Sequence, residues 1–286
     1  MELLLLSNGS LDGESALLDE MQVAHLHVKW ENLVVPGDFS GILKEIPRVV
    51  RWKMEPSDMI FQLGVIEYLG WQGSRIINPP ETILACDKAS MYFTWRTHLA
   101  GSIRFPDTII SREKTRLLDF VRNHVKCVVK PLDGQAGRGI YLVEENNTEA
   151  IDNLCTTLDR KKALFLQDYI PNQGFEIRTV LIGDDVSFQY ARGGGGFKHG
   201  MGSGGKAWRV MDVLPDLPAG TLSTMLSIAM KVKKITGLDT VAVDMLPDLD
   251  GTPWLLEWNP FFSCGGTVRL GLNIEEQIVQ YLLSLP

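Results

Sequence analysis

Short apolar runs separated by amphipathic stretches make up the first third of the chain. The candidate strands in this part are Leu3–Leu6, Val23–Val28, Arg48–Trp52 and Ile76–Ile77. Within Phe61–Leu69, apolar residues recur at the three- and four-residue spacing of a helix. Asn78-Pro79-Pro80 ends the last strand, because proline has no amide hydrogen to donate to a sheet. Residues 1–85 are therefore predicted to form a small α/β unit.

Helical and extended patterns continue to alternate after this unit. Predicted helices cover residues 88–99, 112–123, 149–158, 221–236 and 274–283. Predicted strands cover residues 105–110, 127–131, 140–143, 164–168, 176–181, 186–191, 241–246 and 254–259. Because βα units are mixed with hairpins, we predict an α+β or α/β fold of several lobes. The predicted units are residues 1–85, a central unit of residues 86–170 and a C-terminal unit of residues 171–286.

The composition narrows the class of protein. The chain of 286 residues is 45% hydrophobic and 22% charged, as is ordinary for a globular protein, and its formal net charge is −7. It has no block of Lys and Arg, so we expect no nucleic acid partner, and no apolar stretch long enough for a membrane span. The four cysteines form no Cys-x-x-Cys pair, so we expect no zinc, and their small number favours a soluble cytoplasmic protein.

Three oxygen-bearing side chains near the C-terminus form the strongest candidate site. Glu257 and Asn259 alternate on a predicted strand, so both point to one face. If Asp250-Gly251 centres the preceding turn, Asp244 lies directly opposite Glu257. Two carboxylates so close repel unless a cation lies between them, and oxygen ligands suit Mg²⁺. The alternative is a solvated hairpin face that carries acids by chance.

A glycine-rich turn joins two predicted strands at residues 133–139. Its glycines let backbone amides approach an anion, and its order, G-x-x-G-x-G before a strand, matches neither a Walker A loop nor a dinucleotide fingerprint. Lys130 precedes the turn and can clamp phosphates as a point charge. An ordinary β-turn beside a surface lysine explains the same residues. The candidate ligand-binding residues of the turn are Gly134, Gln135, Gly137 and Gly139.

The next predicted strand breaks at Pro171, which leaves backbone donors and acceptors for the edge of an adenine ring. The residues before this break are Gln167, Asp168, Tyr169 and Ile170. Beyond it, Glu176 and Arg178 alternate onto one strand face. The carboxylate can accept ribose hydroxyls and the arginine can face phosphate. An ordinary ion pair at a sheet edge is the alternative.

A glycine-dense stretch at residues 193–205 predicts a mobile loop. The cations that give it a positive character are Arg192, Lys198, His199, Lys206 and Arg209. We interpret this loop as a flap over an anionic substrate. A disordered surface linker is the alternative.

Taken in this order, the features resemble the ATP-grasp superfamily, and their arrangement is most similar to that of the RimK-type α-L-glutamate ligases. The motifs that carry the resemblance are residues 78–83, 87–88, 128–130, 133–139, 167–170, 176–178, 243–246 and 256–260. The resemblance implies two α+β lobes that clamp ATP, preceded by a small N-terminal α/β pre-ATP-grasp domain.

The resemblance also implies roles for the candidate residues. Those implied in ATP binding are Lys88, Lys130, Gly134, Gln135, Gly137, Gly139, Gln167, Asp168, Tyr169, Ile170 and Glu176. Those implied as ligands of two Mg²⁺ ions, for which Mn²⁺ can substitute, are Asp244, Glu257 and Asn259. The candidate catalytic cations are Arg178, Lys130 and Arg192.

The implied activity is ATP- and Mg²⁺-dependent ligation of a carboxylate to an amine through an acyl-phosphate, with ADP and phosphate released. The resemblance implies glutamate, or a related amino acid, added to a small-molecule or peptide carboxylate. Residues 199–205 and 260–266 depart from the RimK pattern, so the amino acid and the acceptor stay open. A phosphotransferase and an inactive ATP-binding scaffold are the alternatives. By the same resemblance we expect a homodimer or homotetramer.

Overall fold

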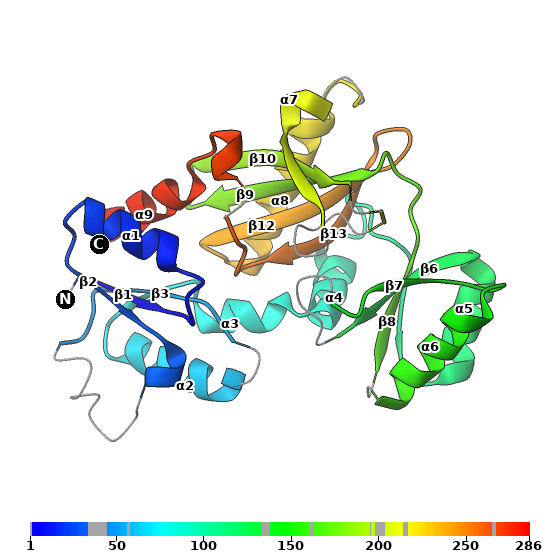
Figure 1. Ribbon diagram of the computed structural model, residues 1–286, viewed down its shortest axis with the longest axis horizontal. Coiled ribbons are helices and arrows are strands. Elements are labelled where there is room, and N and C mark those ends of the chain that lie inside the picture. Colours follow the sequence, from blue (N-terminus) through cyan, green and yellow to red (C-terminus); the bar gives the residue numbers. More distant parts are fainter. Residues whose placement is uncertain are drawn as a thin grey trace.

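The described part of the computed structural model contains three sheets, which Figure 1 shows in sequence colours. The residues it describes are 2–33, 45–55, 58–132, 138–160, 163–194, 196–197, 204–213, 217–264 and 267–286. The mixture of helices, parallel strands and antiparallel hairpins confirms the α+β or α/β class predicted from the sequence.

The N-terminal sheet is parallel and has the strand order β2-β1-β3-β4. Its strands are β1 (Leu3–Leu6), β2 (His25–Val28), β3 (Val49–Trp52) and β4 (Arg75–Ile77). Helix α2 (Met59–Trp71) buries Val65, Ile66 and Leu69, as the apolar spacing predicted. Strand β4 ends where the two prolines begin, and the short helix α3 (Pro80–Ile83) follows. A proline at the start of a helix loses no hydrogen bond, so this helix is compatible with the sequence.

Helix α1 (Asp12–Glu20) was not predicted, because its two leucines are adjacent and give no helical spacing. The amide of Val23 bonds to the carbonyl of Leu18 at 2.9 Å and completes the end of this helix. For this reason β2 begins at His25, whereas the sequence predicted that it begins at Val23. The C-terminal helix α9 (Ile274–Ser284) packs against α1, and Figure 1 shows the two side by side over the N-terminal sheet.

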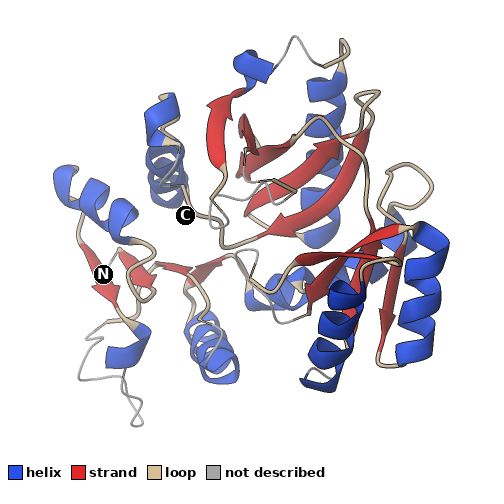
Figure 2. Cartoon of the chain, turned by 45° about the vertical axis from the view of Figure 1, so that its right-hand side comes forward, coloured by secondary structure: helices blue, strands red, loops and turns tan. Residues whose placement is uncertain are grey.

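The central sheet is antiparallel and has the strand order β5-β8-β6-β7. Its strands are β5 (Thr108–Ser111), β6 (Lys126–Pro131), β7 (Tyr141–Glu144) and β8 (Leu164–Asp168). Helices α5 (Lys114–His124) and α6 (Thr148–Arg160) pack on it, as Figure 2 shows. Leu117 and Val121 of α5 join Leu154 of α6 in a separate apolar core under this sheet. Each of these elements lies within a few residues of its predicted place.

The third sheet has five strands in the order β11-β10-β9-β12-β13. Its strands are β9 (Phe175–Ile182), β10 (Val186–Gly193), β11 (Lys206–Arg209), β12 (Thr240–Pro247) and β13 (Pro253–Asn259). Strand β11 and the short helix α7 (Val210–Val213) were not predicted, because both are short and follow the glycine-dense stretch. Lys206 and Arg209 therefore belong to a paired strand.

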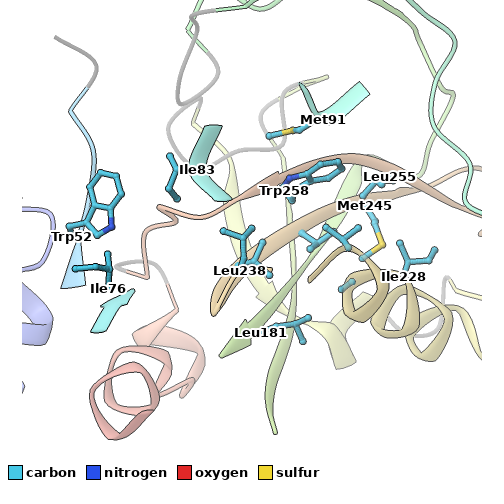
Figure 3. Close-up of a cluster of buried hydrophobic side chains, with 14 of the residues drawn as sticks. Trp52, Ile76, Ile83, Met91, Leu181, Ile228, Leu238, Met245, Leu255 and Trp258 are labelled. Carbon is cyan, nitrogen blue, oxygen red and sulfur yellow. The ribbon is translucent and has the colours of Figure 1, made fainter. Parts of the chain in front are cut away.

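Helix α8 (Thr221–Thr236) covers one face of this sheet with its apolar side. Figure 3 shows the resulting core, in which Met245, Leu255 and Trp258 of the sheet lie near Ile228 of the helix. These sheet residues are fully buried, so the opposite face of the same strands is left for polar side chains. Within the described ranges, no helix is both long enough and apolar enough to cross a bilayer.

The N-terminal and C-terminal sheets share their apolar cores. Leu5 of β1, Val180 of β9 and Ile278 of α9 belong to one buried cluster. The central sheet has its own core, with Phe165 as one of its contacts to the larger one. The three-unit division of the chain stays a prediction.

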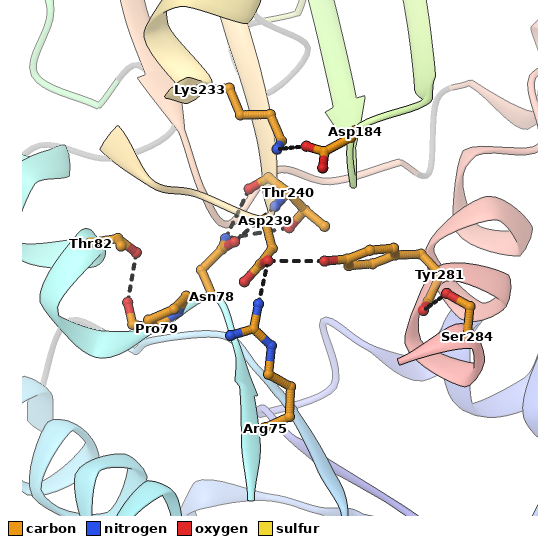
Figure 4. Close-up of polar contacts among 10 residues, drawn as sticks. All are labelled: Arg75, Asn78, Pro79, Thr82, Asp184, Lys233, Asp239, Thr240, Tyr281 and Ser284. Carbon is orange, nitrogen blue, oxygen red and sulfur yellow. Dashed lines mark hydrogen bonds and ion pairs between the residues drawn. The ribbon is translucent and has the colours of Figure 1, made fainter. Parts of the chain in front are cut away.

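Asn78 joins the N-terminal sheet to β12 through a buried set of hydrogen bonds, shown in Figure 4. Its Nδ2 donates to the carbonyl of Thr240 at 2.9 Å, and its Oδ1 accepts from the amide of Thr240 at 2.8 Å. Nearby, Asp239 accepts hydrogen bonds from Arg75 at 2.7 Å and from Tyr281 at 2.9 Å. Polar side chains therefore fix the N-terminal sheet against the end of the C-terminal sheet.

Replacing Asn78 by Ala is expected to lower the free energy of unfolding by about 2–4 kcal/mol, because it leaves the buried amide and carbonyl of Thr240 without partners. Urea unfolding followed by circular dichroism measures this. Thr82→Ala, which removes a half-buried hydroxyl bonded to the Pro79 carbonyl at 2.6 Å, is the control and should cost less. Equal losses in the two variants would show that the Asn78 contacts do not join the sheets as described.

Candidate active site

The β12–β13 hairpin brings the predicted carboxylates together. Asp244 lies directly opposite Glu257, and Ala242 lies opposite Asn259, so the predicted register is confirmed. A bulge produces this register, since the next pair is Met245 with Leu255 and leaves one extra residue on β13. Without that bulge, Asp244 would face the extra residue, which is apolar.

The loop of this hairpin lies between Pro247 and Pro253 and is longer than a two-residue turn at Asp250-Gly251. The Asp248 carboxylate organises it, because Oδ1 accepts from the amides of Asp250 at 3.0 Å and Thr252 at 2.8 Å. Its Oδ2 accepts from Trp254 Nε1 at 2.9 Å. A side chain that satisfies three donors in this way favours a loop over a tight turn.

Two arginines and two carboxylates form a buried network on the polar face of the same sheet. Asp244 of β12 is paired in register with Arg178 of β9, and Glu176 of β9 with Arg192 of β10. Arg178 Nε and Nη2 donate to the two oxygens of Asp244, each at 2.7 Å. Arg192 Nη2 lies 2.9 Å from Asp244 Oδ2 and also donates to Glu176. Arg192 therefore belongs to the sheet and not to the flap.

Burial and charge act in opposite directions on these groups. Burial disfavours the ionised form of Asp244, but Arg178 and Arg192 outweigh it and hold the pKa of this carboxyl below its ordinary value. For Glu176, burial dominates over the attraction of Arg192 and raises the pKa to about 7. Asp244 is therefore ionised at neutral pH, whereas Glu176 titrates near neutrality.

The raised pKa of Glu176 predicts a pH dependence of stability. Between its ordinary value of 4.5 and about 7, the folded protein holds a proton that the unfolded chain has lost. This carboxyl therefore stabilises the fold fully below pH 4.5 and less as the pH rises to about 7. Glu176→Gln should remove that contribution to the slope, measured by urea unfolding at a series of pH values. Identical slopes for the variant and the wild type would contradict the raised pKa.

Two lysines face this sheet across a narrow pocket. The residues lining it are Lys88, Met91, Phe105, Lys130, Phe165, Leu256 and Glu257. Asp87 caps helix α4 (Lys88–His98) by accepting the amide of Ala89 at 2.9 Å, which places Lys88 in its first turn. Burial lowers the pKa of Lys130, and Glu257 opposes that effect. The pocket therefore joins cations from α4 and the central sheet to a carboxylate of β13.

Gln167 holds Lys130 in place. Its Oε1 accepts from Lys130 Nζ at 2.5 Å, and its Nε2 donates to Thr108 Oγ1 at 3.2 Å. The side chain of Gln167 is buried, and both ends of its amide bond to other side chains of the protein. The sequence could not show this contact, because it depends on β8 lying between β5 and β6.

Two backbone amides at the strand break after β8, which were predicted to be free, already form hydrogen bonds within the protein. The Asp168 amide bonds to the carbonyl of Asp107 at 2.8 Å, and the Tyr169 amide bonds to the carbonyl of Lys126 at 3.0 Å. These two amides are therefore not free, which corrects the prediction for them. The carbonyl of Ile170 accepts from Asn172 Nδ2 at 2.9 Å.

Several predicted residues fall outside the described part of the chain. They are Gly134, Gln135 and Gly137 of the glycine turn and Lys198 and His199 of the flap. Gly139, at the end of the glycine turn, is described and has a φ of +72°. A Cβ at this position would lie 2.8 Å from Pro131 Cγ, so the turn ends at a position that requires glycine.

The donor set at the hairpin has the chemistry for Mg²⁺. Among the described residues, no three His, Cys, Asp or Glu side chains gather as a ready-made metal site. Asp244 and Glu257 are nevertheless cross-strand partners, and Asn259 supplies an amide oxygen that accepts the Phe261 amide at 2.8 Å. Three of the four lone-pair positions of Asp244 face arginine donors, which leaves one on Oδ1. Oxygen ligands of this kind fit Mg²⁺ together with phosphate oxygens.

Comparison with known proteins identifies the fold and the type of its central domain. The family model for the ATP-grasp domain of prokaryotic glutathione synthetases matches residues 96–196. The D-cycloserine synthetase DcsG has a similar structure, with a TM-score of 0.70, 18% identity and coverage of 99% of this chain and 98% of that one. Residues 96–196 therefore match an ATP-grasp domain, and the chain as a whole has the ATP-grasp fold.

Two further comparisons agree with this assignment. The RimK-domain ATP-grasp protein of Sphaerobacter thermophilus matches with a TM-score of 0.67 and 16% identity, over 99% of this chain and 100% of that one. The glutathione synthetase of Salmonella typhimurium is 28% identical over 156 residues, which are 52% of this chain and 47% of the synthetase. The alignment thus spans about half the length of that curated relative. The ATP-grasp resemblance stated from the motifs is confirmed.

Proposed function

We propose that this ATP-grasp protein is an ADP-forming ligase that joins a carboxylate to an amine. The observation that carries the proposal is the pocket in which Lys88 and Lys130 face Glu257, beside the buried network of Arg178, Arg192 and Asp244. Cations from one side and oxygen ligands from the other are what a nucleoside triphosphate with Mg²⁺ requires. The glutathione synthetases and the D-cycloserine synthetase among its relatives support a ligase.

The residues of the pocket would divide the work of binding ATP. Lys130, held by Gln167, and Lys88, which the cap of α4 places in the first turn of that helix, would contact the phosphates. Glu257 and Asp244, with Asn259, would hold Mg²⁺, which when bound neutralises phosphate charge during transfer. Glu176, which the motif order assigned to ribose, is bonded to Arg192 and lies within the network. This contact uses only Oε1, so the carboxylate keeps lone-pair positions that could accept a ribose hydroxyl.

The chemistry needs no protein nucleophile. A carboxylate is a poor electrophile, since its leaving group would be oxide, and transfer of the γ-phosphoryl group gives an acyl-phosphate with a good leaving group. Attack by the amine then forms the amide and releases phosphate. Arg178 and Arg192 are buried cations in contact with Asp244, one of the proposed metal ligands, and they are suited to stabilise the oxyanion of this second step.

An amino acid is the proposed amine, and glutamate is the first candidate by its similarity to the RimK type. Amine-dependent phosphate release from ATP, measured over a matrix of amino acids and carboxylic acids, tests the activity. The product should have the summed mass of the two substrates less one water. A product that has gained phosphate would mean a phosphotransferase, and no turnover with any pair would contradict the proposal.

A further inference from the structure

Four buried or half-buried charged side chains meet at the carboxyl edge of the N-terminal sheet, and the proposed ATP site uses none of them. Arg51 comes from β3, Lys53 follows that strand, Glu14 lies in the first turn of α1 and Glu275 in the first turn of α9. Arg51 is 0% exposed, Lys53 7% and Glu14 2%. We name this set the N-terminal charge cluster. In open α/β sheets, ligands bind outside the carboxyl ends of the strands.

The strand pattern explains why these groups meet. Arg51 alternates with Val50 and Trp52, so it lies on the same face of the sheet as Leu5. Helices α1 and α9 pack against each other over this face, as Figure 1 shows. A Cβ on Gly13 of α1 would lie 2.7 Å from Glu275 Oε2, so the glycine lets the two helices approach.

The N-terminal charge cluster is incompletely paired. Arg51 Nη1 donates to Thr240 Oγ1 at 3.0 Å, but its buried Nε and Nη2 have no hydrogen-bond partner in the described chain. Lys53 Nζ donates to the carbonyl of Ser10 at 2.9 Å. Among the described residues, no ion pair joins either cation to Glu14 or Glu275. Buried charges left in this state are costly, and a ligand that brings the opposite charges removes the cost.

The charges of the cluster specify the ligand. The charges of two cations and two carboxylates sum to zero. A ligand with a net positive or net negative charge would therefore leave an excess of charge in a buried place. Glu275 has a raised pKa, first through burial and then through Glu14, with Lys53 opposing. The two acids therefore repel each other, and a positive group between them would relieve this. A neutral ligand with separate positive and negative ends satisfies both halves.

A chain of neighbours links the N-terminal charge cluster to the proposed ATP site. Tyr190 of β10 is fully buried and pairs in register with Arg178. Burial raises the pKa of Tyr190, and Cys264 raises it further. Burial also raises the pKa of Cys264 to about 12, with Glu14 as the next cause. Tyr190 and Cys264 belong to one apolar cluster. A ligand at the cluster therefore lies near the strands that carry the arginine network.

We propose that Arg51, Lys53, Glu14 and Glu275 bind the zwitterion of an α-amino acid. Arg51 Nε and Nη2, with Lys53, take its carboxylate, and the two glutamates take its ammonium group. The inference rests on the proposed function, because the amino acid bound here is the amino-acid substrate of the ligase.

Ligand binding to the full chain tests the site. Each of the twenty common amino acids is added to the protein, with and without Mg²⁺ and a non-hydrolysable ATP analogue, and the melting temperature is recorded. We expect at least one amino acid to raise it. For each hit, the N-acetyl derivative and the carboxamide should bind at least about tenfold more weakly, because each lacks one charge. Equal binding of either derivative, or no hit under both conditions, would overturn the proposal.

Matched variants locate the binding site. Lys53→Met and Glu275→Gln should each weaken the binding of the amino acid at least about tenfold and leave binding of the nucleotide analogue unchanged. Arg48→Met and Glu276→Gln are the controls, since these side chains pair with Glu2 and Asn273 outside the cluster. Arg51→Met is not used, because replacing a fully buried residue can prevent the protein from folding. Amino-acid affinity that is unchanged in both test variants would refute the site.

The two proposals fail separately. Ligation that proceeds with an unaltered KM for the amino acid in Lys53→Met and Glu275→Gln would overturn the binding site and leave the ligase intact. An amino acid that binds at the cluster, with no amide product from any carboxylate, would overturn the ligase and leave the binding site.

Discussion

ATP turnover in Glu257→Gln is expected to fall by about 100-fold or more, with the fold unchanged. The side chain of Glu257 is half-buried, lies opposite Asp244 and lines the pocket with both lysines. Removing its charge takes away one proposed Mg²⁺ ligand and the attraction that opposes the lowering of the Lys130 pKa by burial. Steady-state ADP release under saturating Mg²⁺-ATP measures the effect.

Asp250→Asn is the control for this variant. Asp250 lies at the exposed tip of the same hairpin, and its side chain is not part of the pocket. It should retain wild-type turnover and wild-type melting temperature. Turnover within about threefold of wild type in Glu257→Gln would show that this carboxylate is not a ligand of the metal.

Asp244→Ala is expected to lower the free energy of unfolding by about 3–5 kcal/mol, in addition to abolishing turnover. Asp244 is 1% exposed and accepts from Arg178 and Arg192, so its removal leaves two buried guanidinium groups with one carboxylate, Glu176. Guanidinium chloride is unsuitable because it screens charge, so urea unfolding is the measurement.

A second variant separates the charge effect from the loss of packing. In Asp244→Ala/Arg178→Met, one unpaired cation is removed together with the carboxylate, and part of the lost stability should return. The two single variants and the double variant form a cycle that gives the coupling energy. Strict additivity of the two changes would contradict the ion pair described at 2.7 Å.

The sequence predicted the elements with strong periodicity and the pairing of residues that lie close together in the chain. Helix α8 and strand β8 match their predicted bounds, because each is bounded by a clear change in apolar pattern. The opposition of Asp244 and Glu257 also followed from local hairpin reasoning. The bulge that creates this register was not predicted, since the sequence does not mark which residue is left unpaired.

Contacts between distant strands could not be predicted. Arg192 contacts Asp244 because β10, β9 and β12 are neighbours in the sheet. Local sequence patterns do not determine this strand order. For the same reason the sequence did not show that the side chain of Gln167 holds Lys130. The N-terminal charge cluster is a further case, because it needs β3, α1 and α9 to meet from opposite ends of the chain.

These contacts change how the site is understood. Motif order alone presented Asp244 as a metal ligand, and the structure adds that both of its oxygens lie next to arginines. The same two arginines are therefore partners of the carboxylate and candidates for the oxyanion. Binding of nucleotide and metal at this place has to be compatible with both contacts.

A crystal of the full chain grown with ADP and Mn²⁺, and measured for anomalous scattering of manganese, is the most direct test of the central claim. The account predicts an anomalous peak in contact with Glu257 and Asp244, and diphosphate oxygens in contact with Lys88 and Lys130. Nucleotide bound elsewhere, or a manganese peak remote from both carboxylates, would contradict it.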